Sequence, residues 1–335
     1  MEANIEIAKS LFIQNKYQET IAICNQILAT DINAIEALKL MAKSFLAIRK
    51  PNDAILYLTK ALNISPNDYE TLKDLGNVFQ SFGDANTAKD YYRQAIAINN
   101  SYAPALTNLG SLELKRGNNK EALSFLIKST EADPKLTAAW VNLANGYLHI
   151  GKAQEAETAC RKALELNPVF AEAHSHLGNI LRKLGKLQEA ELSTRQAIEL
   201  KPAFFQAHLS LGAILEDLGQ LQQAELSTRQ AIELTPDSAE AHSNLGNILR
   251  NLGKLKDAEL SYRKAIEIKP DFADAHYNLG IILKDLGNLH EAEISYRKAI
   301  ELNPDYAKAH SNLGNILKDH GNLQEAEVSA RKAIE

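Results

Sequence analysis

The sequence predicts an all-α protein, a right-handed α-solenoid superhelix of about ten 34-residue helix-turn-helix repeats. Three observations support this fold class. A small residue recurs every 34 residues without a break, glycine and proline stop signals keep the same spacing, and the apolar residues between them follow a helical period. A fixed period of roughly 20–50 residues is typical of stacked-repeat proteins. The small residues are Ala8, Ala42, Gly76, Gly110, Ala144, Gly178, Gly212, Gly246, Gly280 and Gly314.

The first predicted helix of each repeat carries an apolar stripe that stops at a glycine. In the sixth repeat the stripe consists of Leu177, Ile180, Leu181 and Leu184. A glycine directly after such a stripe indicates a left-handed helix C-cap. It occurs in the last eight repeats, as Gly83, Gly117, Gly151, Gly185, Gly219, Gly253, Gly287 and Gly321. Asn15 and Arg49 hold this place in the first two repeats, and Arg49 with Lys50-Pro51 predicts a looser stop.

The second predicted helix ends at a proline, which cannot continue a helix. The prolines in this register are Pro66, Pro134, Pro168, Pro202, Pro236, Pro270 and Pro304. The period therefore makes residues 1–335 a single array with repeats starting near residues 1, 35, 69, 103, 137, 171, 205, 239, 273 and 307. The last repeat is incomplete and has no polar capping helix. We therefore expect the chain to belong to a longer protein.

Composition narrows the possible functions. A net charge of −5 and a pI near 6.0 argue against a nucleic-acid footprint. The two cysteines, Cys24 and Cys160, share one register position but are separated by eight predicted helices, too far for a disulfide, so we expect buried packing residues. The start at Met1 does not resemble a signal peptide, and no run of about 18 apolar residues occurs. We expect a cytoplasmic protein that does not enter a membrane.

The register also carries a family resemblance. Position 8 of the repeat is glycine or alanine, position 20 is alanine in nine repeats, position 27 is alanine in eight, and position 32 is usually proline. This pattern resembles the tetratricopeptide repeat family over the whole chain. The family's aromatic residue at position 4 occurs here as Trp140, and five later repeats have histidine instead: His174, His208, His242, His276 and His310. We expect these histidines to pack between helices, because repeats are too far apart to share a metal ion.

Asparagines suggest a binding surface. Asparagine forms helices poorly, yet it recurs at positions 6 and 9 of the first helix. In the tetratricopeptide family these positions face the inner, concave groove. An amide offers both a donor and an acceptor, so it can hold a peptide bond whatever the side chain. The candidate residues are Asn77, Asn108, Asn142, Asn145, Asn179, Asn244, Asn247, Asn278, Asn312 and Asn315.

These rows resemble the asparagine ladder in the repeat arm of O-GlcNAc transferase, which implies an extended peptide as ligand. Duplication of one ancestral repeat is the alternative explanation. Lys73, Asn77 and Asn108 also match three positions of a carboxylate clamp for acidic chaperone tails, but Ala138 and Asn142 leave that clamp without two of its charges.

The groove wall is expected to carry charges of both signs, among them Arg182 and Arg250. This mixture suits a peptide better than a phosphate backbone, and a nucleic-acid-binding solenoid is the less favoured alternative. Glutamate and arginine four residues apart in the second helix, as in Glu259 and Arg263, predict ion pairs on a solvated face.

The sequence shows no phosphate loop, dinucleotide motif, paired-cysteine metal spacing or nucleophile elbow. We therefore expect no catalysis by these residues, and no cofactor or metal. The predicted function is a protein-interaction scaffold that binds an extended peptide or a partner helix. The alternative is the substrate-recruiting arm of a larger transferase, for sugar or sulfate, whose catalytic domain follows residue 335. The sequence does not predict the oligomeric state.

Overall fold

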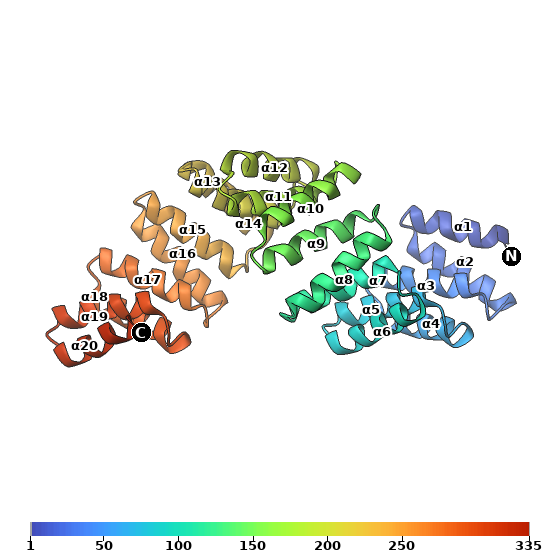
Figure 1. Cartoon of the computed structure of the whole chain (residues 1–335), viewed down its shortest axis with the longest axis horizontal. Helices are drawn as coiled ribbons and strands as arrows, with labels where there is room; N and C mark the ends of the chain where they lie inside the picture. Colours follow the sequence, from blue (N-terminus) through green and yellow to red (C-terminus); the bar gives the residue numbers. More distant parts are fainter. Residues whose placement is uncertain (1, 335) are drawn as a thin grey trace. The chain divides into compact units, whose positions relative to one another are not determined.

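The computed structural model describes residues 2–334 and has twenty α-helices and no strand within them. In order along the chain (Figure 1) they are α1 (Glu2–Ile13), α2 (Tyr17–Thr30), α3 (Ile35–Ala47), α4 (Pro51–Ile64), α5 (Tyr69–Ser81), α6 (Ala85–Ile98), α7 (Ala103–Lys115), α8 (Asn119–Ala132), α9 (Thr137–His149), α10 (Ala153–Leu166), α11 (Ala171–Lys183), α12 (Leu187–Leu200), α13 (Phe205–Asp217), α14 (Leu221–Leu234), α15 (Ala239–Asn251), α16 (Leu255–Ile268), α17 (Ala273–Asp285), α18 (Leu289–Leu302), α19 (Ala307–Asp319) and α20 (Leu323–Lys332). The predicted all-α solenoid of helix pairs is confirmed.

The chain divides into two compact units, Met1–Pro168 and Val169–Glu335. The first unit contains α1–α10 and the second contains α11–α20, so each holds five helix pairs. The boundary follows Pro168, one of the prolines that ends a second helix. Among the helices of residues 2–334, none is both long enough and apolar enough to cross a membrane.

The turns between paired helices have the backbone geometry that the glycines predict. All eight cap glycines have positive φ angles, between 74° at Gly185 and 85° at Gly287. Asn15 and Arg49 take the same left-handed conformation at 61° and 60°. The looser stop expected at Arg49 is therefore a regular left-handed cap, made by a residue that bears a Cβ atom.

Arg49 is thus a strained residue, and replacing it by glycine should stabilise the protein. The left-handed conformation costs a residue with a Cβ roughly 1–2 kcal/mol. Glycine avoids that cost but loses more entropy on folding, so we expect Arg49→Gly to stabilise by about 0.5–1 kcal/mol. Thermal melting measures the change. Arg116→Gly is the matched control, because Arg116 has a φ of −86° and should gain nothing; equal shifts in both variants would contradict the explanation.

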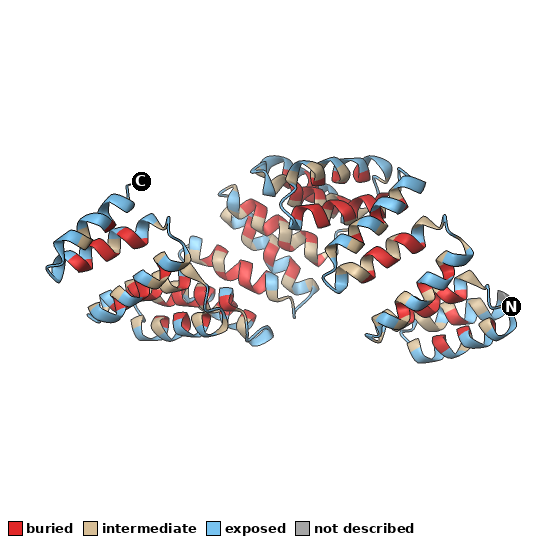
Figure 2. Ribbon diagram, turned by 90° about the horizontal axis from the view of Figure 1, so that it is seen from below, coloured by how far each residue is buried: buried red, intermediate tan, exposed pale blue. Residues whose placement is uncertain are grey.

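Close approach of the paired helices explains the small residues. A Cβ atom added to Gly246 would lie 2.7 Å from the ring of Tyr262, and one added to Gly280 would lie 2.6 Å from the ring of Tyr296. The position-20 alanines, such as Ala258 and Ala292, have no exposed surface. Figure 2 shows the result as buried stripes along helices whose other faces are exposed. The core therefore runs between helices, as in a stacked array.

Consecutive first helices approach each other within each unit. In the first unit α5 contacts α7 and α7 contacts α9, and in the second unit α11, α13, α15 and α17 form a similar series. Consecutive second helices show no comparable contact in the described part of the chain. The side of each unit made by the first helices is therefore the more tightly spaced one, and we call it the inner face.

Candidate functional site

The candidate asparagines all lie on first helices. The first unit carries Asn77 on α5, Asn108 on α7, and Asn142 and Asn145 on α9. The second unit carries Asn179 on α11, Asn244 and Asn247 on α15, Asn278 on α17, and Asn312 and Asn315 on α19. All are half-buried except Asn315, which is exposed. Their amides therefore border the inner face, where a ligand can reach one side of each group.

In the first unit two of these asparagines are hydrogen-bonded to each other, and a tyrosine bonds to one of them. The hydroxyl of Tyr92, on α6, lies 2.8 Å from Asn77 Oδ1 and 2.7 Å from Gln80 Oε1. Asn108 Nδ2 donates to the same Asn77 oxygen over 2.6 Å. The three side chains come from α5, α6 and the following first helix α7. They therefore form a hydrogen-bonded bridge from one repeat to the next.

The second unit repeats this arrangement. The Tyr262 hydroxyl, on α16, donates to Asn247 Oδ1 over 2.7 Å, and Asn278 Nδ2 approaches the same oxygen at 3.4 Å. Burial raises the pKa of Tyr262 well above its ordinary value, and so it raises that of Tyr92. Both phenols therefore stay protonated and act as donors near neutral pH.

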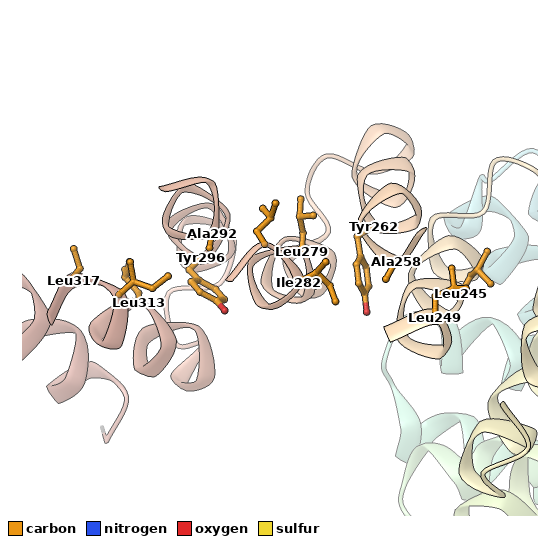
Figure 3. Close-up of a cluster of buried hydrophobic side chains, with 12 residues drawn as sticks. Leu245, Leu249, Ala258, Tyr262, Leu279, Ile282, Ala292, Tyr296, Leu313 and Leu317 are labelled. Atoms are coloured by element: carbon orange, nitrogen blue, oxygen red, sulfur yellow. The ribbon is translucent and has the colours of Figure 1, made fainter. Parts of the chain in front are cut away.

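The ninth repeat breaks the arrangement. Ile281 occupies the place of Asn77 and Asn247, so it offers no oxygen to the tyrosine below it. Tyr296 has no exposed surface, and its hydroxyl proton finds no acceptor within residues 2–334. Figure 3 shows Tyr262 and Tyr296 with their hydroxyl oxygens on the same side of the apolar cluster. The two tyrosines thus differ in partner rather than in placement.

A pocket of about 510 Å³ opens on the inner face of the second unit. Its lining includes the candidate residues Asn244, Asn247 and Asn278, and it also includes Ser243, Phe272, Asp274, Tyr277, Tyr306, Ala307 and Lys308. Three first helices, α15, α17 and α19, contribute to it. The pocket therefore combines free amide groups with three aromatic rings and one charge of each sign, a lining suited to a polar chain with apolar side groups.

Contacts among the pocket residues hold the aromatic wall in place. The rings of Tyr277 and Tyr306 have centroids 4.9 Å apart, and the Tyr306 hydroxyl donates to Asp274 Oδ1 over 2.6 Å. Burial and the neighbouring Asp274 carboxylate raise the pKa of Tyr306. Asn312 Nδ2 reaches the Tyr277 hydroxyl at 3.4 Å. The wall is thus braced across two repeats before any ligand arrives.

The remaining candidate residues are placed differently. Asn142 Nδ2 donates to the carbonyl of Ala138 in its own helix, so this amide is partly occupied. Lys73 forms an ion pair with the adjacent Asp74. Arg182 pairs with Asp217 over 2.5 Å across one repeat, which places charges of both signs on the wall. Arg250 is half-buried on α15, the helix that carries Asn244 and Asn247.

The histidines at position 4 make the same hydrogen bond to a turn proline that Trp140 makes. Trp140 Nε1 donates to the carbonyl of Pro134 over 2.9 Å. His208 Nε2 lies 2.8 Å from the carbonyl of Pro202, and His310 Nε2 lies 2.8 Å from that of Pro304. The same ring-to-carbonyl bond thus ties the first helix to the preceding turn, and the predicted packing role is confirmed. In the described residues, no three His, Cys, Asp or Glu side chains gather as a metal site.

The cysteines are also packing residues. Cys24 and Cys160 are reduced thiols, and both are fully buried. Burial raises the pKa of Cys24 to about 11 and that of Cys160 to about 12. Such thiols remain protonated and are poor nucleophiles. The prediction from their shared register position is confirmed.

Sequence reasoning missed the aromatic members of the site. Tyr92 and Tyr262 belong to the second helix, whose residues were assigned to packing and to the solvated face. Phe272 and Tyr306 lie just before the first helices α17 and α19, outside the groove positions considered. A signal was present, because tyrosine recurs at position 24 opposite a position-8 glycine in repeats three, eight and nine.

Comparison with known proteins identifies the repeat family. The family model described as the cilia and flagella-associated protein 70 C-terminal domain matches residues 6–280. Two models described as tetratricopeptide repeat match residues 273–306 and 295–328. Among curated proteins no significant match was found.

Solved structures share the fold. A monomeric IFIT1 mutant solved with Gppp-AAAA is 16% identical, covers 98% of this chain and 89% of its own, and has a TM-score of 0.65. A tetratricopeptide repeat protein from Parabacteroides merdae ATCC 43184 is 20% identical over 74% of this chain and 98% of its own, with a TM-score of 0.58. YrrB, described as a TPR protein with an unusual peptide-binding site, is 28% identical over 55% of this chain and 95% of its own, with a TM-score of 0.44. The chain therefore belongs to the tetratricopeptide repeat family, in the group defined by the C-terminal domain of cilia and flagella-associated protein 70.

Proposed function

We propose that the protein is a non-catalytic, cytoplasmic interaction scaffold whose inner face binds an extended peptide segment of a protein partner. In this proposal residues 1–335 act as a single array of ten repeats. The observation that carries it is the pocket of about 510 Å³ on the second unit, where three asparagines meet three aromatic rings. Tetratricopeptide repeats generally mediate protein–protein interaction, which supports the class of partner.

The amide donors and acceptors that remain available in the pocket match the groups of a peptide main chain. In the described part of the chain, the amide of Asn244 has no hydrogen-bond partner, so its donor and its acceptor are both available. Asn247 and Asn278 each have one amide atom engaged and one left over. A main chain needs both donors and acceptors, whereas a phosphate backbone needs donors and positive charge. With Asp274 beside Lys308 in the lining, a peptide is favoured over a nucleic acid.

The incomplete carboxylate clamp has less support than the pocket. Lys73 is engaged by Asp74, and Asn77 and Asn108 are hydrogen-bonded to each other. The asparagine rows resemble those in the repeat arm of O-GlcNAc transferase, and this resemblance supports an alternative function. In that version the same face recruits substrate for a transferase domain, for sugar or sulfate, located after residue 335.

Alanine substitution of three asparagines tests the peptide site. A peptide is first selected against the full chain from a display library of random 12-residue sequences, and its affinity is measured by calorimetry. Each lost hydrogen bond is worth about 0.5–1.5 kcal/mol. We therefore expect the combined Asn244→Ala, Asn278→Ala and Asn312→Ala variant to bind at least about tenfold more weakly, with unchanged helicity.

The control is Asn303→Ala, which alters an exposed asparagine in the turn after α18. It should bind the selected peptide like the unaltered protein. An unchanged affinity of the triple variant would remove the asparagines from the binding site. Selection of nucleic acid instead of peptide in a parallel experiment would overturn the proposed class of partner.

A further inference from the structure

Tyr262 determines which atom of Asn247 is left for a ligand. Tyr262 has no exposed surface, and its hydroxyl carries a single proton. Asn247 Oδ1, at 2.7 Å, accepts that proton. If the amide of Asn247 were rotated by half a turn, its NH₂ group would face the hydroxyl and the buried proton of Tyr262 would have no acceptor. A buried donor without an acceptor is strongly disfavoured, so the oxygen of Asn247 is held toward the tyrosine.

This orientation gives opposite roles to two of the three asparagines that line the pocket. With Oδ1 engaged, Asn247 has its Nδ2 group left to donate to a ligand. Asn278 gives one Nδ2 hydrogen to Asn247 and keeps its own Oδ1 as an acceptor. The pocket therefore offers a donor from α15 and an acceptor from α17. In an extended chain, the C=O and N–H of one residue point to the same side, as they do in an antiparallel ladder.

We propose that Tyr262 is a positioning residue for main-chain recognition: it fixes Asn247 as the donor to a peptide C=O and Asn278 as the acceptor from the N–H of the same residue. This inference rests on the proposed peptide-binding function. In the first unit Tyr92 bonds to Asn77 in the same way, but Gln80 offers its hydroxyl a second acceptor, so the orientation of Asn77 is not fixed by Tyr92 alone. The recognised group is an extended secondary amide, so a proline or an N-methylated residue at that point of the peptide is excluded.

The ninth repeat provides a natural contrast. Tyr296 has the same buried position as Tyr262, but Ile281 stands where the asparagine would be, and the hydroxyl proton has no acceptor in the described residues. Tyr296 therefore orients no position-9 amide. Removal of its hydroxyl should leave peptide binding unchanged, which makes Tyr296→Phe the matched control for Tyr262→Phe.

The Asn247→Asp substitution tests the orientation. A carboxylate keeps an acceptor for Tyr262 and Asn278 but replaces the outward donor by a second acceptor. We expect a Tm within about 2 °C of the unaltered protein, and an affinity for the selected 12-residue peptide reduced about tenfold or more. An unchanged affinity would show that the outward atom of Asn247 does not donate to the peptide and would overturn the proposal.

Tyr262→Phe tests the positioning role by a double-mutant cycle. Without the hydroxyl both amide orientations become available, and equal populations would weaken peptide binding about twofold. The carboxylate of Asn247→Asp is symmetric, so Tyr262→Phe should change the affinity no further in that background. Equal loss of affinity in both backgrounds would mean that Tyr262 acts only through general stability, which overturns the positioning role.

N-methylation of the selected peptide gives a second test, with affinity as the measured quantity. Among singly N-methylated versions of the selected peptide, at least one should lose about tenfold in affinity for the unaltered protein, because its N–H no longer reaches Asn278. Uniform tolerance of methylation would overturn main-chain recognition. If the unaltered protein selects no peptide, the proposed function fails. If it selects a peptide that Asn247→Asp and Tyr262→Phe bind as well as the unaltered protein does, the positioning role alone fails.

Discussion

Replacing Lys89 by methionine is expected to destabilise the protein by roughly 3–5 kcal/mol at neutral pH, because Lys89 is the charged partner of a fully buried carboxylate. Glu113, on α7, has no exposed surface, and Lys89 Nζ lies 2.7 Å from its Oε1. Asn118 Nδ2 donates to Oε2 over 2.5 Å. Without Lys89 the carboxylate would keep the hydrogen bond from Asn118 and the charge of Arg116 but lose its direct ion pair.

Glu113 occupies a register position that the later repeats fill with leucine, including the buried Leu249 and Leu283. The second substitution Glu113→Leu should therefore recover most or all of the stability that Lys89→Met removes. Buried ion pairs can often be replaced by apolar residues at little cost. Urea unfolding followed through Trp140, the single tryptophan of the chain and a member of the same unit, reports both variants. A double variant no more stable than Lys89→Met would contradict the ion-pair explanation.

The contribution of Glu113 to the pH dependence of stability should have opposite signs in the unaltered protein and in the Lys89→Met variant. Burial alone would raise the pKa of Glu113, but hydrogen bonds from Lys89 and Asn118 outweigh it and leave the pKa below its ordinary value. The unfolded chain then takes up this proton first as the pH falls, so the unaltered protein loses stability toward acid pH. In Lys89→Met, burial dominates and raises the pKa. Its deficit relative to the unaltered protein should therefore shrink as the pH is lowered toward 5.

The sequence was sufficient for the repeat and its local geometry, because each of those features depends on residues of one repeat. Gly185 and its counterparts identify the left-handed caps, since few residues other than glycine adopt that conformation cheaply. Gly246 indicates a close helix contact because a Cβ there would meet Tyr262. The departure at Arg49 was also visible, although its backbone proved to be a regular cap.

The candidate site was less predictable because its contacts cross repeats. Asn247, Tyr262 and Asn278 come from three helices, and their pairing depends on the spacing between stacked repeats rather than on any local pattern. The same limit applies to surface ion pairs. The predicted pair of Arg263 with Glu259 is present at 2.8 Å, but Arg263 also reaches Glu291 in the next repeat at 2.6 Å. Register positions locate a residue on a face without stating which neighbour it meets.

Leu245 offers the sharpest test of the buried face. It lies next to the binding-site helix residues Asn244 and Asn247 on α15, yet it is only 4% exposed and packs in the cluster that contains Leu249 and Tyr262. Figure 3 shows Leu245 and Leu249 in one row of buried side chains with Ala258 and Tyr262. One helix thus carries half-buried asparagines and a buried leucine on different faces, as the 3.6-residue period requires.

Leu245→Ala should therefore destabilise the protein by roughly 2–5 kcal/mol, through lost apolar burial and the cavity left behind. Leu260→Ala is the matched control. Leu260 is on the neighbouring helix α16 but is 66% exposed, so its replacement should change stability by no more than about 0.5 kcal/mol. Thermal unfolding followed by circular dichroism measures both. A loss below about 1 kcal/mol for Leu245→Ala would place this leucine outside the core, and the assignment of Asn244 to the opposite, ligand-facing side of α15 would fail with it.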